Sequence, residues 1–265
     1  MYLDKKVILK NIRKYNGKHL CEKAHGFPLN EYYDALVIAP VWRPDMIGTD
    51  EDIMIEQCTQ RVYTSTFILK NNKQKKIAWI QCAAGKSNLL DDLMLCLEMN
   101  VGKLFFAGAV GGLAEEFQVG DLCTPEKIIH PCISPEMYLE KKLFDIPMTL
   151  PTLTIEQKNI DAISNAAGNI SDKPLKTGTV FCVDSISLEY SHLKEIVSTG
   201  ANLIEMETGT FVRLAEFFEL PYHILLVVSD NSASGQPLLV DDEKKMEEYK
   251  KTRAMIPRLI FQILG

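Results

Sequence analysis

Two glutamates flank one methionine in the segment LIEMETGTF, which covers residues 203–211. Glu205 and Glu207 stand directly before an apolar run with helical spacing, where the positive end of a helix dipole favours carboxylates. In an extended segment their side chains point to the same side of the chain. The pair could therefore be a structural helix start or two acids available for chemistry.

Two aspartates follow buried strands that the hydrophobic pattern predicts. Asp230 comes directly after such a strand, and Asp45 follows ALVIAP after a short loop. Sites in α/β proteins collect at the carboxyl ends of strands. Both aspartates are therefore candidates for chemistry, although Asp230 could equally cap a turn. The segment GAVGG at 108–112 also ends a strand, but it lacks the lysine of a phosphate-binding loop.

Other common catalytic patterns are missing from the sequence. It contains no Ser/His/Asp arrangement and no metal-ligand spacing, and its five histidines form no cluster. The seven cysteines include no C-x-x-C pair and are odd in number. This usage is typical of reduced, mostly buried thiols, so we expect a cytoplasmic protein.

Composition limits the possible partners. The 265 residues carry a net charge of −6, which argues against a nucleic acid held by phosphate neutralisation. No apolar run approaches the ~18 residues of a membrane span, and the first residues lack a signal-peptide core. We expect a small-molecule partner, with no nucleic acid and no membrane.

Alternating strand and helix patterns predict an α/β protein with a largely buried sheet. Ser87 and Thr154 are the expected N-caps of two helices. Residues 1–34 show no clear period and are expected to be an N-terminal extension, followed by one domain over 35–265. Strands are expected at 35–40, 62–69, 76–82, 103–112, 119–130, 176–183 and 222–230, and helices at 87–100, 154–167, 209–220 and from 241 onward.

The segment IEMETGTFVRLAEFFELPYHILLVVSDNS resembles a signature of the nucleoside phosphorylase and nucleosidase family. LFFAGAVGGLAEEFQVGDLCTPEKIIH and TGTVFCVD are similar to two further segments of that family, and ALVIAPVWRPD stands at its first strand and loop. The resemblance covers roughly residues 35–264. It implies a single α/β domain with a mixed, partly barrel-like sheet flanked by helices, and cleavage of the N-glycosidic bond of a nucleoside.

The resemblance also implies roles for the acids. Glu207 would hold the ribose hydroxyls, Met206 would pack on the sugar, and Glu205 would have a lesser role. Cleavage builds positive charge on the ribose, which a carboxylate on the sugar hydroxyls can stabilise. Asp230 would protonate N7 of a departing purine, which requires a raised pKa.

Further positions match residues that surround the base and the sugar. Ser185 and Ser187 stand where uridine-specific members carry a glutamine and an arginine, so a purine base is favoured. The matched lining positions are Phe181, which would stack on the base, and Cys182, Ala109, Val110 and Gly111.

The choice between phosphate and water as nucleophile depends on the phosphate-binding residues. Phosphorolytic members use a glycine and an arginine where this sequence has Val41 and Phe106, and a hydroxyl residue where it has Ala109. Asp45 stands near the place where hydrolytic members carry a water-activating glutamate. Hydrolysis is therefore favoured. Phosphorolysis with a rebuilt anion site around Arg43 and a noncatalytic nucleoside-binding protein remain alternatives.

The family resemblance implies no metal and no organic cofactor, with phosphate as a co-substrate only in the phosphorolytic case. It implies a homodimer or higher homo-oligomer, because family members commonly build their site at a dimer interface. Some members receive a histidine from the neighbouring chain, and His25 and Pro28 fit that position equally well.

Overall fold

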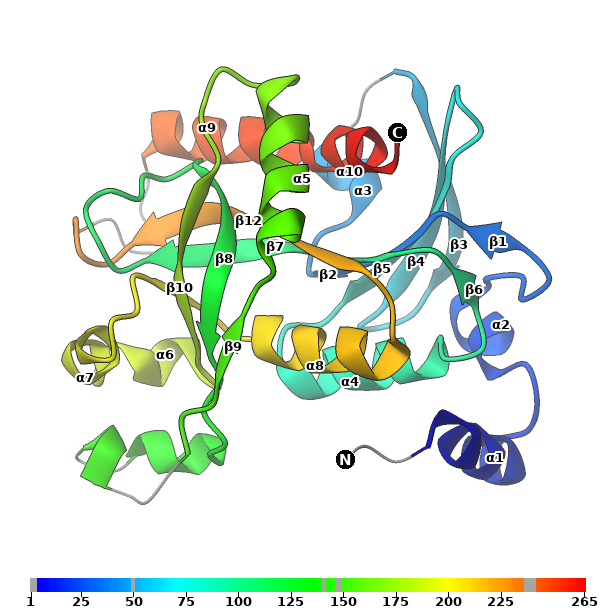
Figure 1. Ribbon diagram of the computed structural model, residues 1–265, viewed down its shortest axis with the longest axis horizontal. Coiled ribbons are helices and arrows are strands. Elements are labelled where there is room, and N and C mark those ends of the chain that lie inside the picture. The colour runs from blue at the N-terminus through cyan, green and yellow to red at the C-terminus, as the bar shows by residue number, and fades with distance from the viewer. Residues whose placement is uncertain (1–3, 49–50, 140–141, 146–148, 236–241) are drawn as a thin grey trace.

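The computed structural model describes residues 4–48, 51–139, 142–145, 149–235 and 242–265. One long twisted sheet runs through the molecule, with helices on both faces (Figure 1). One part of this sheet has the spatial order β12 (Tyr222–Asn231), β7 (Leu104–Gly112), β2 (Ala35–Pro40), β5 (Lys76–Cys82), β4 (Ser65–Asn71) and β3 (Ile53–Gln60). Four neighbouring strands of this sheet, β12, β7, β2 and β5, are parallel to one another. The next two strands, β4 and β3, add to β5 by antiparallel pairing.

The other end of the sheet curls into a closed ring. β11 pairs with both β10 and β7, so the ring runs β7-β12-β8-β10-β11 and returns to β7. This ring confirms the prediction of a mixed, partly barrel-like sheet. The strands added here are β8 (Leu122–Ile129), β10 (Lys176–Cys182), β11 (Leu203–Glu205) and β9 (Thr152–Thr154), which pairs with β8.

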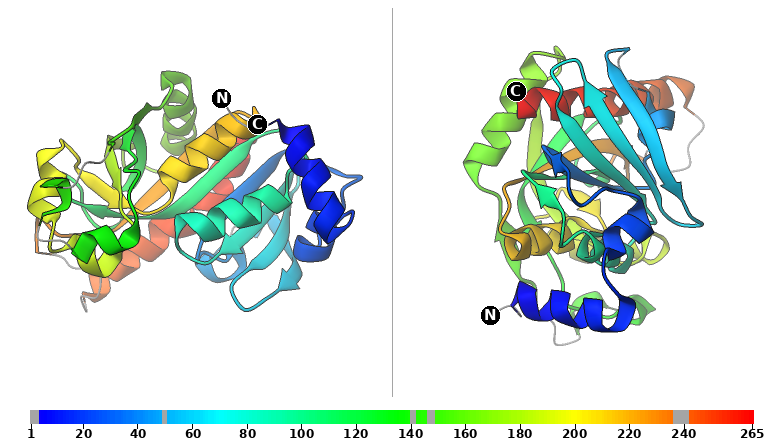
Figure 2. Two further views of the ribbon diagram at one scale, coloured as in Figure 1. Left: turned by 90° about the horizontal axis from the view of Figure 1, so that it is seen from below. Right: turned by 90° about the vertical axis from the view of Figure 1, so that its right-hand side faces the viewer.

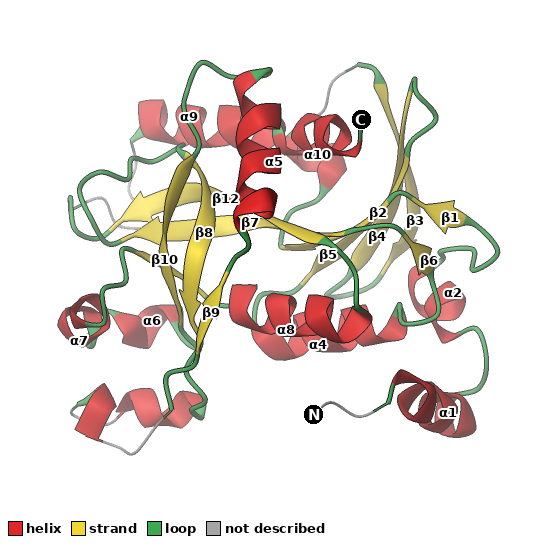
Figure 3. Cartoon of the chain, in the orientation of Figure 1, coloured by secondary structure: helices red, strands yellow, loops and turns green. Residues whose placement is uncertain are grey.

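Alternate side chains of the buried strands enter two core layers, as the two-residue period of a strand requires. In β2, Leu36 and Ile38 join one layer, whereas Val37 and Ala39 join the other. The first layer is covered by α4 (Lys86–Leu95) and α8 (Thr208–Phe218). The opposite layer is covered by α5 (Gln157–Gly168), α9 (Glu243–Ala254) and α10 (Ile256–Leu264), as Figure 3 shows.

Short helices fill the connections near the strand ends. They are α3 (Pro44–Ile47), α6 (Ile186–Glu189), α7 (Leu193–Ser198) and the 3₁₀ turns η1 (Pro135–Leu139) and η2 (Leu143–Asp145). No helix within the described part of the chain has the length and apolar character needed to cross a membrane.

Two expected helix caps are wrong. α4 begins after Gly85, whose φ of 105° suits a residue without a side chain, so Ser87 lies inside the helix. Thr154 lies in β9, where it pairs with Lys127, and α5 begins only after Glu156. The segment from 241 onward forms two helices because Met255 and Pro257 interrupt the first one; residue 241 itself lies outside the described residues.

The first 34 residues contain more regular structure than their sequence indicates. They form α1 (Lys5–Asn16), α2 (Leu20–His25) and β1 (Tyr32–Tyr33), which pairs with β6 (Asn100–Val101). No residue of α1 is fully buried, and Figure 2 shows this helix at the edge of the molecule. The side chains of Cys21, Phe27 and Tyr33 are instead completely buried in the core. An arm-like character therefore belongs to α1 alone.

Candidate active site

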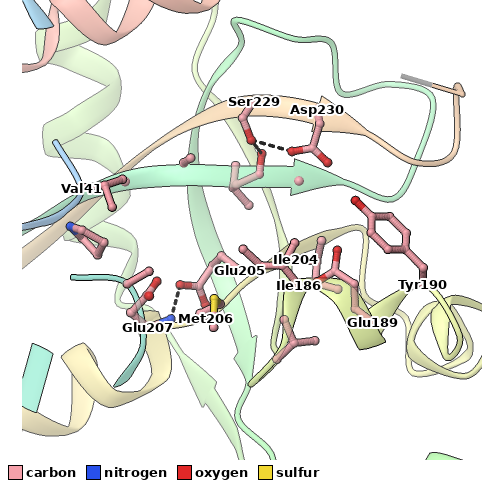
Figure 4. Close-up of a pocket in the computed structure, with 17 residues that line it drawn as sticks. Val41, Ile186, Glu189, Tyr190, Ile204, Glu205, Met206, Glu207, Ser229 and Asp230 are labelled. Atoms are coloured by element: carbon pink, nitrogen blue, oxygen red, sulfur yellow. Dashed lines mark hydrogen bonds between the residues drawn. The ribbon is translucent and has the colours of Figure 1, made fainter. Parts of the chain in front are cut away.

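A cavity of about 150 Å³ opens where β2, β5, β7 and β12 end (Figure 4). The carboxyl ends of these four parallel strands meet at one place, as expected for a site in an α/β fold. The loop after β10 and the segment from β11 into α8 complete the wall. The lining residues are Pro40, Val41, Ala84, Gly108, Ala109, Val110, Gly111, Val183, Ile186, Glu189, Tyr190, Ile204, Glu205, Met206, Glu207, Ser229 and Asp230.

Glu205 is held by hydrogen bonds on both carboxylate oxygens. Oε2 accepts the backbone N–H of Glu207 at 2.6 Å and that of Thr208 at 2.8 Å. Oε1 accepts the Thr208 hydroxyl at 2.6 Å and the Cys182 thiol at 2.8 Å. These donors include the first free N–H groups of α8, which have no partner within the helix. Glu205 therefore caps α8 from the last residue of β11.

Glu207 presents its carboxylate to the cavity at the start of two helices. It is the N-cap residue of α8, and its Oε1 accepts the backbone N–H of Gly85, the N-cap residue of α4, at 2.5 Å. Burial and the neighbouring Glu205 raise the pKa of Glu207 to about 8, although backbone N–H groups of Gly85 and Met206 oppose this. A buried acid of this kind can accept hydrogen bonds from a bound hydroxyl pair.

Asp230 lies opposite a residue that leaves room for its carboxylate. It pairs in register with Gly111 of β7, and a Cβ atom at Gly111 would lie 3.2 Å from Asp230 Oδ2. The register shifts between Val228 and Asp230, and both Ser229 and Asp230 line the cavity. Burial raises the pKa of Asp230, while the Ser229 hydroxyl, which donates to Oδ1 at 2.6 Å, acts against that rise.

Glu189 and Tyr190 also line the cavity, although neither was predicted from the sequence. Both lie at the end of α6, in a segment whose letters show no clear period. The Glu189 side chain is buried, and its pKa rises to about 8 because of burial and the charge of Asp230. Glu189 is one of several acids downstream of the strand at 176–183, after Asp184 and before Glu195, so the sequence gives no reason to select it.

The structure brings together most of the expected site residues. Glu205, Met206, Glu207, Asp230, Ala109, Val110 and Gly111 all line the one cavity. Phe181 does not reach it, because its fully buried ring packs in the core, and Val183 takes the lining position. Cys182 does not line the cavity either, and its thiol donates a hydrogen bond to Glu205, which does. Stacking of Phe181 on a base would require this wall to open.

Arg43 and Asp45 lie close to the cavity but do not line it. The two guanidinium nitrogens Nε and Nη2 of Arg43 donate to the two Asp45 oxygens at 3.1 and 2.8 Å. The Arg43 guanidinium also sits 5.3 Å from the ring centre of Phe67. In this arrangement each charged group satisfies the other, so neither is directed at a ligand.

The backbone between these residues and β2 is strained. Val41 has a φ of 54°, in the left-handed region that a β-branched residue rarely adopts, and its backbone borders the cavity. Such a conformation costs ~1–3 kcal/mol and persists where the surroundings enforce it. Val41 lies in the turn that follows β2, and this turn forms part of the cavity wall.

The ionisable groups on the cavity wall are all acids. Among the described lining residues there are four carboxyl groups, from Glu189, Glu205, Glu207 and Asp230, and no lysine, arginine or histidine. No group of three or more histidine, cysteine, aspartate or glutamate side chains suited to a metal ion occurs in the described part of the chain.

Comparisons with known proteins agree with this fold. Solved structures similar to it include futalosine hydrolase from Helicobacter pylori, with a TM-score of 0.62, 18% identity and coverage of 87% of this chain and 98% of that one. Another is the 5'-methylthioadenosine/S-adenosyl homocysteine nucleosidase of Campylobacter jejuni, with a TM-score of 0.65, 16% identity and coverage of 86% and 97%. A uridine phosphorylase of Phytophthora capsici has a TM-score of 0.71, 13% identity and coverage of 91% and 92%.

At these identities the solved structures show a shared fold. A search of curated protein sequences gives no match. A family model described as the phosphorylase superfamily matches residues 55–263, which is most of the sequence. The chain therefore belongs to the phosphorylase superfamily.

Proposed function

We propose that this protein hydrolyses the N-glycosidic bond of a purine nucleoside or a 5'-substituted purine nucleoside. The superfamily contains nucleosidases, which use water, and nucleoside phosphorylases, which use phosphate. The observation that favours water over phosphate as the nucleophile is the composition of the cavity wall. The described residues supply four carboxyl groups to this wall and no cation.

A phosphate dianion would find no compensating charge in this cavity. Burying such an anion without donors is costly, and any carboxyl group of the wall that is ionised would add repulsion. Phe106 is buried beneath the wall, with its ring centre 5.6 Å from that of Phe211. Arg43 is already paired with Asp45. A neutral water molecule avoids these costs.

The placed acids suit cleavage of a nucleoside. In its ionised form, which positive charge on the sugar favours, Glu207 accepts hydrogen bonds from the ribose hydroxyls and stabilises that charge as the bond to N9 breaks. Met206 packs on the sugar. Asp230 donates a proton to N7, so the base leaves as a neutral molecule. The positions of Glu207 on α8 and Asp230 on β12, facing one cavity, support these roles.

The base preference rests on what borders the base side of the cavity. Asp230 offers a proton to a purine N7. Ser185 accepts the Leu188 backbone N–H at 3.3 Å as the N-cap of α6, and Ser187 is not among the lining residues. Neither supplies the amide and guanidinium that would read a pyrimidine edge. A purine is therefore the better fit.

Activation of the water by Asp45 is tested by the Asp45→Asn variant. Because Arg43 holds Asp45 outside the cavity wall, we expect the variant to lose less hydrolytic rate than Asp230→Asn. The kcat of both variants on one substrate gives the comparison. Equal losses would show that Asp45 leaves Arg43 during turnover, and an unchanged rate would remove Asp45 from the mechanism.

The test of the proposed function is base release from a nucleoside panel with and without phosphate. The panel contains adenosine, inosine, 5'-methylthioadenosine, futalosine and uridine. We expect free base and free sugar from a purine nucleoside in phosphate-free buffer. Release that requires phosphate and yields a sugar 1-phosphate would establish phosphorolysis. Saturable binding without release from any substrate would establish a nucleoside-binding protein.

The remaining predictions concern the assembly and its surroundings. We propose a homodimer or higher homo-oligomer in the cytoplasm that needs neither a metal nor an organic cofactor. Light scattering after size-exclusion chromatography tests the assembly, and activity after dialysis against a chelator tests the metal.

A further inference from the structure

Glu189 is a buried acid to which the proposed reaction assigns no role. It is the last residue of α6, and only 5% of its surface is exposed. Figure 4 shows Glu189 and Tyr190 pointing from α6 toward β12, which carries Asp230. The carboxyl group of Glu189 receives no hydrogen bond from the described residues, so it is free to interact across the cavity.

The groups around Glu189 offer it no positive charge. Asp230 faces it from β12, Tyr190 follows it in the chain, and Tyr138 approaches from η1, which packs against α6. Tyr138 and Tyr190 both have raised pKa values because of burial, and the charge of Glu189 adds to this rise. Both tyrosines are thus neutral at ordinary pH. The charge that acts on Glu189 is that of Asp230.

Two carboxyl groups in a poorly hydrated cavity cannot both ionise at low cost. The pair therefore keeps one proton over a wide pH range, and its two titrations belong to the pair as a whole. Burial and the charge of Asp230 together raise the pKa of Glu189 to about 8. At neutral pH the shared proton thus resides mainly on Glu189.

We propose that Glu189 is a positioning residue that retains a proton within the cavity and thereby keeps Asp230 supplied with the proton that the departing base needs. This rests on the proposed function. The family resemblance implies the acid role for Asp230 alone, whereas the structure places a second acid on the wall of the same cavity, on a different element of the fold.

The proton balance of one turnover closes within the cavity. The bond between C1' and N9 breaks with its electron pair going to the base, and N7 takes a proton from Asp230. This is the one proton that the pair holds, and it passes from Glu189 to Asp230 before N7 takes it. Water adds its oxygen to C1' and releases one proton, which returns to the carboxyl pair. The products are neutral base and sugar, and Glu189 is protonated again.

The first test is the pH profile of kcat/KM for Glu189→Gln and for Asp230→Asn. Glutamine holds no ionisable proton, so the alkaline limb of Glu189→Gln should move at least one pH unit toward acid. Because one pKa unit is a factor of ten, the variant should be at least ~10-fold slower than the wild type at pH 8 and nearly equal at pH 5.5. Glu189→Asp should recover part of the profile.

The matched control is Glu126→Gln, a change of the same type on the exposed face of β8. It should leave the profile unchanged. A Glu189→Gln enzyme that is slower by one constant factor at every pH would show a merely structural role and would overturn the proposal, as would an unshifted profile.

The second test measures the carboxyl pair in the absence of substrate. Carbon-13 NMR of glutamate-labelled protein should show two carboxyl signals that titrate near pH 8, those of Glu189 and Glu207. The signal that is absent in Glu189→Gln should shift toward acid in Asp230→Asn. If the enzyme is active but the pKa of Glu189 is the same in the wild type and in Asp230→Asn, the proposal for Glu189 is overturned and the proposed function stands. A coupled pair in a chain that cleaves no nucleoside would refute the proposed function, and with it the role of Glu189 in turnover.

Discussion

Glu205 and Glu207 stand two residues apart, yet their carboxylates face different partners. Four hydrogen bonds occupy Glu205, whereas Glu207 has its carboxylate at the cavity wall and one bond to the Gly85 backbone. The first is suited to holding a helix and the second to holding a ligand. This division predicts different outcomes when each acid is replaced by its amide.

Glu207→Gln should weaken both nucleoside binding and turnover. An amide keeps the shape but offers one acceptor instead of two, and it cannot balance positive charge on the sugar. We expect kcat/KM to fall by about 10² or more, and Kd for a nucleoside to rise as well. Calorimetric binding and steady-state kinetics measure the two effects. A normal kcat with normal binding would show that Glu207 does not hold the sugar.

Asp230→Asn should lose turnover while it keeps binding. General acid catalysis is worth ~10²–10⁴ in rate, and asparagine has no acidic proton to give. Asparagine and aspartate have nearly the same shape, and Gly111 leaves the same space beside residue 230 in the variant. Single-turnover kinetics with a Kd measurement on the same sample separate the two effects. An unchanged rate would assign the acid to another group.

At the residue scale, the sequence was sufficient to select most of the acids but not to assign partners to them. Alternation places Glu205 and Glu207 on the same side of a strand, so their letters alone cannot tell them apart. Their difference comes partly from the turn into α8, which directs the N–H groups of Glu207 and Thr208 at Glu205. The rest comes from Cys182 and Gly85, which are distant in the chain. Glu189 was missed for the same reason, since its importance depends on Asp230 across the cavity.

At the element scale, the start of α8 depends on a residue outside it. Glu205→Gln should lower the free energy of unfolding by about 1–3 kcal/mol. The amide nitrogen of the glutamine would face hydrogen-bond donors at a buried position and leave them without an acceptor. For a chain of this size this loss of stability is a fall in Tm of a few degrees. Differential scanning fluorimetry measures it, with Glu126→Gln as the control. No change in Tm would mean that water replaces these bonds.

The central strands were predictable from the sequence because nearly every residue in them is apolar. β2, β5, β7 and β12 were expected within one residue of their observed bounds. β3 was missed because its polar residues do not alternate regularly with its apolar ones, and β11 because three residues carry no period. The closing pairing of β11 with β7 depends on contacts between distant segments, so the ring itself came only from the family resemblance.

At the scale of the whole molecule, buried titratable groups make stability depend on pH. Glu189 and Glu207 keep their protons to about pH 8 in the folded chain, but near pH ~4 when unfolded. The folded state therefore binds more protons between these values, and the free energy of unfolding falls as the pH rises. Burial lowers the pKa of His25 and His223 to about 4, so they oppose this trend only below pH ~6.5.

We therefore expect the ligand-free protein to lose stability between pH 6.5 and 8. Urea denaturation at several pH values in this window measures the slope. Glu189→Gln and Glu207→Gln should each make the slope flatter, since neither amide titrates. A slope of zero in the wild-type protein would show that water reaches these acids and removes the cost of ionising them.

The acidic wall of the cavity also determines which molecules could block it. A cation in this cavity would favour the ionised form of the four carboxyl groups, whereas the described lining residues offer an anion no positive charge. A sugar mimic with an ammonium group in place of its ring oxygen would present that charge where the departing base creates it. Phosphate esters and other anions, by contrast, would be rejected at the entrance. An inhibitor for this protein should therefore be selected from cations first.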